Sequence, residues 1–321
     1  MALVTAFVAA FGYGSYRLLG AEVTPGPRLA VVRPGIAHAG EVDLIVWPES
    51  AIGDEIDRNG AYLHALTWLG SSTHAPVLLG AQGRAEGLVG RTTNSAFLVD
   101  EEGALCGRYD KQLLFPYVEY VPYDKLAGSV DPAVQRAYRR LVRKSWGFLS
   151  NGTPGRTMTL FALPWKGGTI SFAAMISMES SYPPLVAEAS RRGARFLVNL
   201  SSEDEFSGVI QEQLLRVSML RAVENRIGYL RATNTGISAF IDPRGRLRSV
   251  RDGAGGETTA GAGVLTGTVA LQPSGPTAYA ASHDAFALLC VAASFWLLAR
   301  ALLRGPATMT PHPVPAAATA T

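Results

Sequence analysis

Short runs of apolar and β-branched residues recur along the middle of the chain and predict buried β-strands. These runs lie at 28–34, 43–49, 76–82, 94–100, 170–177, 195–201 and 238–245. Between several of them, apolar residues recur every three or four positions, which predicts helices over 54–70, 183–192 and 210–226. Strands that alternate with helices indicate an α/β fold with mostly buried sheets. We therefore expect one soluble domain over residues 28–275.

Two longer apolar stretches lie outside this domain and predict membrane helices over residues 1–20 and 285–304. The first, ALVTAFVAAFGYGSYRLL at 2–19, has about the length of one membrane crossing. A signal peptide is the alternative, but no Lys or Arg precedes its apolar part and no clean small-residue cleavage site follows.

The second stretch, AFALLCVAASFWLLARALL at 285–303, has Arg300 and Arg304 at its far end. The positive-inside tendency places these arginines in the cytoplasm and the domain before the helix outside. After Arg304 the composition becomes low in complexity, which predicts a disordered tail over 305–321.

Residues 132–146, PAVQRAYRRLVRKSW, form a short basic helix in the predicted pattern. Its basic residues are Arg136, Arg139, Arg140, Arg143 and Lys144. A basic amphipathic helix beside a membrane domain can lie against anionic lipid headgroups. A solvated surface helix is the other interpretation, and the sequence leaves both open.

Composition narrows the functional classes. Only 17% of the 321 residues are charged, which agrees with segments that do not face water. The net charge of +3 and the lack of a basic stripe interleaved with aromatics argue against nucleic-acid binding. The spacing of His and Cys does not suggest a metal site. A disulfide between the two cysteines, Cys106 and Cys290, is not expected.

Candidate chemistry lies where predicted strands end. Ser177 ends the run at 170–177, and the turn after it leads into a helix near Pro183. A nucleophile at such a turn needs a base to remove its proton and a cation to stabilise the charge on the attacked carbonyl. Glu49 ends DLIVWPE and Lys111 follows LCGRY, so each of them supplies one of these groups. Taken alone, each is better explained as an ordinary surface charge.

Three stretches taken together resemble a known family: WPES at 47–50, YDKQLLFPYVEYVP at 109–122 and ISMESSYP at 176–183. Their order and spacing resemble the nitrilase (carbon–nitrogen hydrolase) superfamily, with its Glu, Lys and Cys triad. Within it the chain is most similar to the apolipoprotein N-acyltransferase family. LRAVENRIGYLRATNTGISAFIDPRGRL at 220–247 also matches that family's pattern. The resemblance covers about residues 29–304.

This resemblance implies a four-layer α-β-β-α sandwich and a set of residue roles. Glu49 is then the base, Lys111 the oxyanion partner, and Ser177 occupies the position of the nucleophile. Glu119 and Glu179 support them, and Trp47, Met178 and Asn234 are expected to contact substrate. The family uses no cofactor and no metal. It takes an acyl chain from a phospholipid and adds it to a diacylated lipoprotein, on the outer side of the bacterial inner membrane.

Three departures from the family qualify this interpretation. The family's cysteine is Ser177 here, and its N-D-A-W-F-G loop is SEDEFSG at 202–208. The family has about eight membrane helices, and the stretch at 2–19 resembles only the last of those that precede the domain. A serine hydroxyl is a weaker acid than a thiol, so a non-catalytic relative that binds lipoproteins or a membrane partner is the alternative function. A soluble amidase of the wider superfamily is a third. Cys106 as a substitute nucleophile is not favoured, because it is expected to lie in the core.

Overall fold

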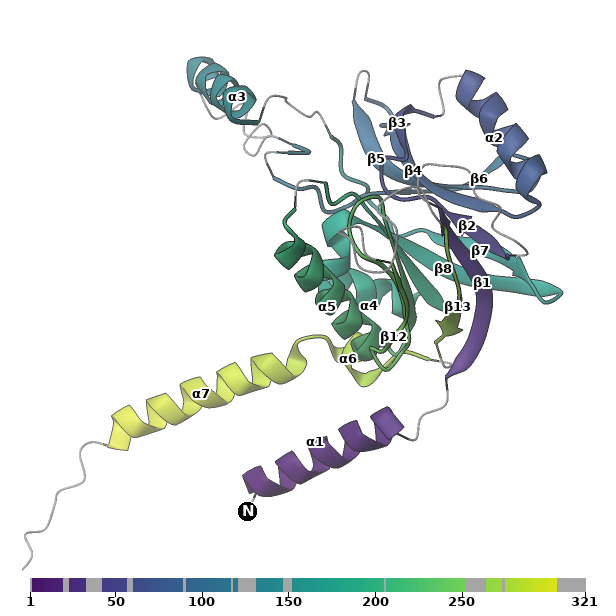
Figure 1. Ribbon diagram of the computed structural model, residues 1–321. Coiled ribbons are helices and arrows are strands. Elements are labelled where there is room, and N and C mark those ends of the chain that lie inside the picture. The colour runs from purple at the N-terminus through teal and green to yellow at the C-terminus, as the bar shows by residue number, and fades with distance from the viewer. Residues whose placement is uncertain are drawn as a thin grey trace, which may run out of the picture. The chain divides into compact units, whose positions relative to one another are not determined.

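The computed structural model describes eleven segments of the chain (Figure 1). They are residues 2–19, 23–32, 42–56, 60–88, 91–116, 118–120, 131–146, 152–204, 206–251, 264–272 and 275–304. The predicted tail at 305–321 and Glu205 of the variant loop lie outside them. Two compact units are found, Met1–Ala281 and Ser282–Thr321, and each is described by itself.

The first unit contains a seven-stranded sheet in the order β13-β1-β2-β4-β5-β6, with β3 paired to β4. Strands β1, β2 and β4 are parallel neighbours, and β13, β5 and β6 join them in antiparallel fashion. The strands are β1 Thr24–Val32, β2 Leu44–Val46, β3 Ile52–Glu55, β4 Val77–Arg84, β5 Thr92–Val99, β6 Leu105–Asp110 and β13 Val264–Leu271.

A second sheet has six strands in the order β12-β11-β10-β9-β8-β7. Its central strands β8, β9 and β10 are parallel, so their carboxyl ends meet at one edge. The strands are β7 Leu160–Trp165, β8 Gly168–Ile176, β9 Phe196–Ser201, β10 Gly228–Thr233, β11 Ser238–Ile241 and β12 Leu247–Arg251.

The alternation of side chains along the strands explains how the two sheets pack. On β4, Leu78 points into a core shared with Phe172 and Phe196 of the second sheet, whereas Val77 and Leu79 point to the opposite face. That outer face packs against Leu66 of α2 (Gly60–Thr73).

The outer face of the second sheet is covered by α4 (Pro183–Arg191) and α5 (Gly208–Asn225). The layers are therefore helix, sheet, sheet and helix, as predicted (Figure 1).

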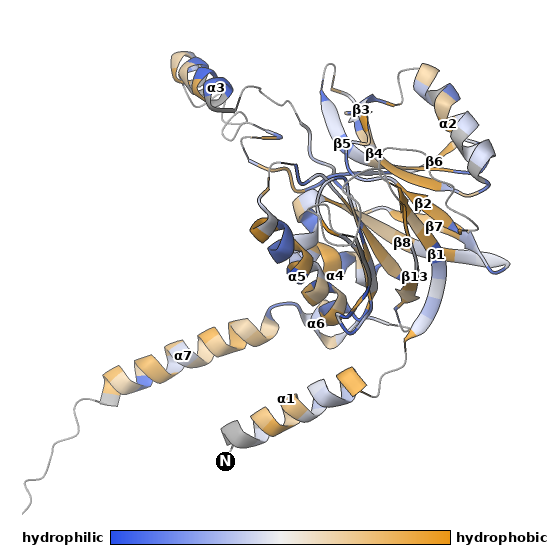
Figure 2. Cartoon of the chain, viewed as in Figure 1, coloured by the Kyte–Doolittle hydropathy of each residue, from blue (hydrophilic) through white to orange (hydrophobic). Residues whose placement is uncertain are grey.

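The remaining helices are α1 (Ala2–Leu19), α3 (Pro132–Trp146), the single-turn η2 (Ser177–Ser181), α6 (Ala278–Ser282) and α7 (Ala285–Arg304). Among the described residues, one stretch is long and apolar enough to cross a membrane, Ala285–Leu303 in α7. Its side chains are almost uniformly apolar (Figure 2). Residues 2–19 form the expected helix, but that helix is not among the candidate spans, so a membrane crossing there stays a prediction.

Some elements differ from the predicted pattern. The helix expected at 54–70 begins only at Gly60, because residues 52–55 pair with β4 as strand β3. Strands β7, β10, β12 and β13 were not predicted. β13 pairs along its whole length with β1, more than 230 residues earlier in the sequence, so its pairing is decided by tertiary contacts.

Candidate active site

Glu49 lies just beyond the carboxyl end of β2 and is 6% exposed. Backbone hydrogen bonds hold the segment before it against β4: Trp47 N donates to Leu78 O (2.8 Å), and Gly80 N donates to Pro48 O (3.3 Å). A Cβ on Gly80 would lie 2.6 Å from the Cα of Glu49, so only glycine permits this close approach. The register of β2 and β4 therefore fixes where the carboxylate lies.

Lys111 follows β6 directly and is 2% exposed. Its Nζ lies 2.8 Å from Oε2 of Glu119 and 3.5 Å from Oε1 of Glu49. Burial by itself lowers the pKa of Lys111, but the carboxylates of Glu49 and Glu119 outweigh that effect and raise the pKa above its usual value. Lys111 is therefore a permanent cation between two acids.

Asn94 on β5 links the two acids and was missed by the sequence analysis. Its Nδ2 donates to Oε1 of Glu49 (2.7 Å) and to Oε1 of Glu119 (2.8 Å). The only sequence signal was an amide side chain at the polar start of a strand whose second half is apolar. Its role depends on strand register, because Lys111 N donates to Asn94 O (2.8 Å) and so brings the two residues side by side.

Ser177 begins η2 at the carboxyl end of β8. Its φ is +54°, in the left-handed region that disfavours a residue with a side chain by about 1 to 2 kcal/mol. Two donors hold its carbonyl oxygen: Asn199 Nδ2 and Ser180 Oγ, each at 3.1 Å. Such a strained turn at a strand end is typical of functional sites. The adjacent Met178 is 38% exposed.

Glu179 ties this turn to the segment after Lys111. Its Oε1 accepts hydrogen bonds from Gln112 N (2.6 Å), Leu113 N (3.1 Å) and the Tyr109 hydroxyl (2.9 Å), and its Oε2 accepts from Ile176 N (2.8 Å). Burial raises the pKa of Glu179 and the backbone donors lower it, with burial the larger effect. Glu179 therefore links the turn at Ser177 to the segment that follows Lys111.

A second link runs through the sheet. Ile176 pairs with Leu200, so the segments that follow β8 and β9 leave the sheet side by side. After β9, Ser202 N donates to Oε2 of Glu49 (2.8 Å). The structure therefore brings Glu49, Lys111 and Glu119 into direct contact and connects the Ser177 turn to them on both sides. Their convergence on one reacting carbon stays a prediction.

The structure says less about the residues that were expected to contact substrate. Trp47 is half-buried and packs on the outer core of the first sheet. Asn234 accepts from Glu203 N (3.1 Å) and donates to Ser202 Oγ (2.8 Å), so its side chain is occupied in holding the segment after β9. A substrate-binding role for these residues stays a prediction.

A cavity of about 270 Å³ lies beside the two acids. It is lined by Ser50, Gln82, Thr92, Thr93, Asn94, Leu114, Val118, Glu119 and Gly152. Glu119 and Asn94 also belong to the charged cluster around Lys111, so the cavity borders that cluster.

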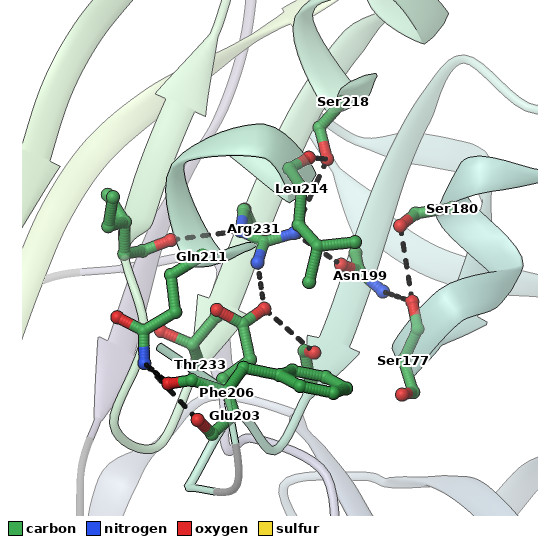
Figure 3. A network of polar contacts seen from close by, with 12 residues as sticks. Ser177, Ser180, Asn199, Glu203, Phe206, Gln211, Leu214, Ser218, Arg231 and Thr233 are labelled. Carbon is green, nitrogen blue, oxygen red and sulfur yellow. Dashed lines mark hydrogen bonds and ion pairs between the residues drawn. The ribbon is translucent and has the colours of Figure 1, made fainter. Parts of the chain in front are cut away.

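Beneath the Ser177 turn lies a buried polar network that sequence reasoning did not find (Figure 3). Arg231 of β10 forms an ion pair with Glu203 and donates to Asn199 Oδ1 at 3.4 Å. Asn199 in turn donates to the carbonyl oxygen of Ser177. Burial lowers the pKa of Arg231 to about 10. The network therefore connects a fully buried charge pair to the candidate nucleophile's backbone.

Cys106 differs from expectation. It is exposed rather than in the core, because β6 is the edge strand of its sheet and Cys106 lies on the face opposite the inward-pointing Tyr109. Its thiol donates to Leu98 O (3.4 Å), and burial together with Asp100 raises its pKa. Among the described residues there is no cluster of His, Cys, Asp or Glu that could hold a metal ion.

Comparison with known proteins gives a consistent result. The model of the carbon-nitrogen hydrolase family matches residues 13–279. The chain is 32% identical over 268 residues to an apolipoprotein N-acyltransferase of Geobacter metallireducens, covering 83% of this chain and 47% of that protein. It is 29% identical over 221 residues to apolipoprotein N-acyltransferase 2 of Treponema pallidum, covering 65% and 37%. The chain thus spans less than half the length of these relatives.

Among solved structures, an amidase from Nesterenkonia sp. has the same fold. The TM-score is 0.54 with 17% identity, over 83% of this chain and 97% of the amidase. A variant of that amidase carries the acetamide moiety of fluoroacetamide bound covalently at its active-site cysteine.

Proposed function

This chain belongs to the carbon–nitrogen hydrolase family, and from that premise we propose that it transfers an acyl chain from a phospholipid to the N-terminus of a diacylated lipoprotein. The observation that carries the proposal is the buried cluster of Glu49, Lys111 and Glu119, joined on two sides to the strained turn at Ser177. The similarity to apolipoprotein N-acyltransferases supports the choice of substrates.

In the first half-reaction, the Ser177 hydroxyl attacks the carbonyl carbon of a phospholipid ester. Glu49 takes the hydroxyl proton, and the C=O electron pair moves onto oxygen to give a tetrahedral oxyanion. The oxyanion collapses, the bond to the glycerol oxygen breaks, and the leaving alkoxide receives the proton from Glu49. The product is an acyl ester on Ser177.

The second half-reaction repeats these steps with an amine. The α-amine of the lipoprotein attacks the acyl-Ser177 ester, Glu49 accepts the amine proton, and the serine oxygen leaves and recovers a proton. Lys111 is suited to stabilise both oxyanions, because neighbouring acids keep it protonated and it is almost free of water.

Glu119 and Asn94 have positioning roles in this scheme. Glu119 shares the Lys111 ammonium with Glu49, and Phe115 N helps to hold Glu119 by also donating to its Oε2 (2.7 Å). Asn94 donates to both acids, which keeps their like charges apart while lowering their repulsion. These contacts hold Glu49 in place as the base, with its negative charge balanced by Lys111 and Asn94 together.

Serine in the nucleophile position favours a second candidate function. A thiol with a pKa of about 8.5 gives thiolate far more readily than a hydroxyl gives alkoxide, and a carboxylate is a weak base for serine. An oxygen ester also reacts more slowly with an amine than a thioester does. A relative that keeps the fold and binds lipoproteins or a membrane partner without turnover is the alternative.

Acyl-enzyme trapping separates the two functions. The full chain is incubated with a phospholipid carrying a labelled acyl group, as wild type and as Ser177→Cys and Ser177→Ala. We expect label on the wild type at a slow rate, none on Ser177→Ala, and at least about 100-fold faster labelling of Ser177→Cys, since about 3 kcal/mol of barrier corresponds to this factor.

The chemistry of the adduct provides an internal check. Neutral hydroxylamine should release the label from Ser177→Cys, which holds a thioester, but not from the wild type, which holds an oxygen ester. If neither protein takes up label while both keep the native circular dichroism spectrum, the acyltransferase proposal is wrong and the binding function is favoured.

A further inference from the structure

Helix α3 (Pro132–Trp146) separates its charged and apolar residues onto opposite faces. Arg136, Arg140 and Arg143 follow one another at helical spacing, with Lys144 beside them. Val134, Ala137 and Leu141 follow the same spacing on the other side, and no acidic residue occurs in the helix. The proposed acyl transfer assigns no role to this segment.

The ends of α3 are stabilised by its own residues. Asp131 precedes the helix and accepts a hydrogen bond from Ala133 N (2.6 Å), and Pro132 takes the first helical position. Arg143 and Lys144 lie in the last turn, where positive charge is favoured by the helix dipole. These local features favour both ends of the helix, but fifteen residues alone are marginally stable in water.

The apolar face of α3 is open. Val134 is 58% exposed and Leu141 is 62% exposed, although both belong to the side of the helix that a soluble protein would bury. Within the part of the chain that the structure describes, Arg136, Arg140, Arg143 and Lys144 make no ion pair. Among the described residues, neither the basic face nor the apolar face of α3 has the partner that its chemistry requires.

We propose that α3 lies in the headgroup region of an anionic lipid bilayer, with Val134 and Leu141 inserted among the acyl chains and the basic face toward the phosphates. An anionic membrane supplies both missing partners at once, because it offers negative charge above an apolar phase. The chain also contains a stretch, Ala285–Leu303, that is long and apolar enough to cross a bilayer. A protein partner would need a negatively charged surface beside an apolar groove.

Charge should decide the strength of this interaction. A basic side chain near an anionic membrane surface contributes about a fivefold gain in partitioning. Replacing Arg136, Arg140 and Arg143 by Gln should therefore weaken binding about 100-fold. Gln has nearly the helix propensity of Arg, so the helix itself should survive the change. Replacement of the same three residues by Lys keeps the charge and should leave binding nearly unchanged.

The test uses the full chain in lipid nanodiscs, with a polarity-sensitive fluorophore on a single introduced cysteine. In a Cys106→Ser, Cys290→Ser background, Leu141→Cys places the probe on the apolar face and Arg143→Cys places it on the basic face, on the opposite side of the helix. Discs contain either phosphatidylcholine alone or phosphatidylcholine with about 30 mol % phosphatidylglycerol, which supplies the anionic surface.

We expect the Leu141→Cys probe to shift to the blue and to be quenched by spin-labelled lipid only in the anionic discs. About 0.5 M salt should reverse the shift, because it shortens the screening length to a few ångströms. The Arg143→Cys probe should stay polar, the triple Gln variant should lose the blue shift, and the triple Lys variant should keep it.

Three outcomes would overturn the proposal. A probe at 141 that stays polar in both kinds of disc means a solvated helix. A blue shift that is equal in both kinds of disc, and that the triple Gln variant keeps, means that α3 inserts into the membrane without recognising anionic lipid. A blue shift without lipid quenching means that α3 packs on protein. None of these readouts uses acyl transfer, so they are independent of the proposed function.

Discussion

Replacing Glu203 by Gln tests whether the buried charge pair in Figure 3 is as costly to break as its surroundings indicate. Arg231 is 1% exposed and Glu203 is 0% exposed, so neither charge is solvated by water. The remaining contacts of the guanidinium are weak or neutral: Ile237 O at 3.0 Å, Asn199 Oδ1 at 3.4 Å and Ser218 Oγ at 3.5 Å. Glu203 is thus its only negative partner among the described residues.

The magnitude follows from the pKa of Arg231. Burial lowers it from 12.5 to about 10. Each pKa unit corresponds to about 1.4 kcal/mol, so desolvation costs the guanidinium about 3 kcal/mol. Without Glu203 that cost is no longer offset, and we expect Glu203→Gln to lower the free energy of unfolding by about 3 to 5 kcal/mol.

The partner variant should behave differently. Arg231→Met leaves the carboxylate of Glu203 buried, but a carboxyl group can take up a proton and become neutral, so this variant should be less destabilised. The double variant Glu203→Gln, Arg231→Met removes the buried charge altogether. It should be more stable than Glu203→Gln alone, because buried pairs are often replaced by uncharged residues at little cost.

Urea denaturation of the full chain in detergent, followed by tryptophan fluorescence, measures these differences when the m-value is unchanged. The matched control is Glu212→Gln, which breaks an i,i+4 pair with Arg216 whose side chains are 55% and 69% exposed. That change should cost less than about 0.5 kcal/mol. The reasoning is refuted if Glu203→Gln lies within about 1 kcal/mol of wild type, or if the double variant equals the sum of the single ones.

Further measurements address the active-site cluster. Gly80→Ala should lower the free energy of unfolding by about 1 to 3 kcal/mol, since its Cβ would press on the backbone of Glu49, whereas Gly53→Ala meets open space and should be nearly neutral in the same urea titration. Glu179→Gln should cost about 2 to 3 kcal/mol, because one oxygen acceptor facing backbone N–H groups becomes a donor. An effect no larger than that of Glu188→Gln, which breaks an exposed pair with Arg192, would contradict this. The raised pKa of Lys111 means that the native state holds this proton more tightly than the unfolded state, so its stabilisation is complete below pH 10.5 and is lost as the pH rises further. The Lys111→Met variant should not show this loss of stability. If the free energies of unfolding of the wild type and the variant decline in parallel above pH 10.5, this contribution of Lys111 is ruled out.

The fold was largely predictable where local pattern and tertiary role agree. β2, β4, β5, β8 and β9 are central strands, buried on both faces, and such strands appear in the sequence as continuous apolar runs. Helices α4 and α5 were predicted within one or two residues of their observed ends. β12 and β13 were missed because they carry Gly, Arg or Thr among their apolar residues, and their partners supply what their own sequence lacks.

The candidate site, like the fold, was predictable from the sequence only in part. Glu49, Lys111, Glu119 and Glu179 were each found from the residues at the ends of strands and from a family resemblance, and the structure places the first three in contact. Asn94 and the Ser202 N–H, which hold Glu49, were not assigned. The pair of Arg231 and Glu203, which reaches the Ser177 carbonyl through Asn199, was not assigned either. Their importance depends on residues that lie 25 to 153 positions away.

The sequence by itself determined the types of element, the alternation that buries them, and the chemical groups available at the strand ends. Those properties depend on neighbours within a few positions, where the periods of strand and helix act. Only the tertiary structure decided which of these groups form hydrogen bonds or ion pairs with one another, and which of them lie at a strained turn. Hydrogen bonds and ion pairs act over about 3 Å, and no local pattern records which distant segments the two packed sheets bring that close.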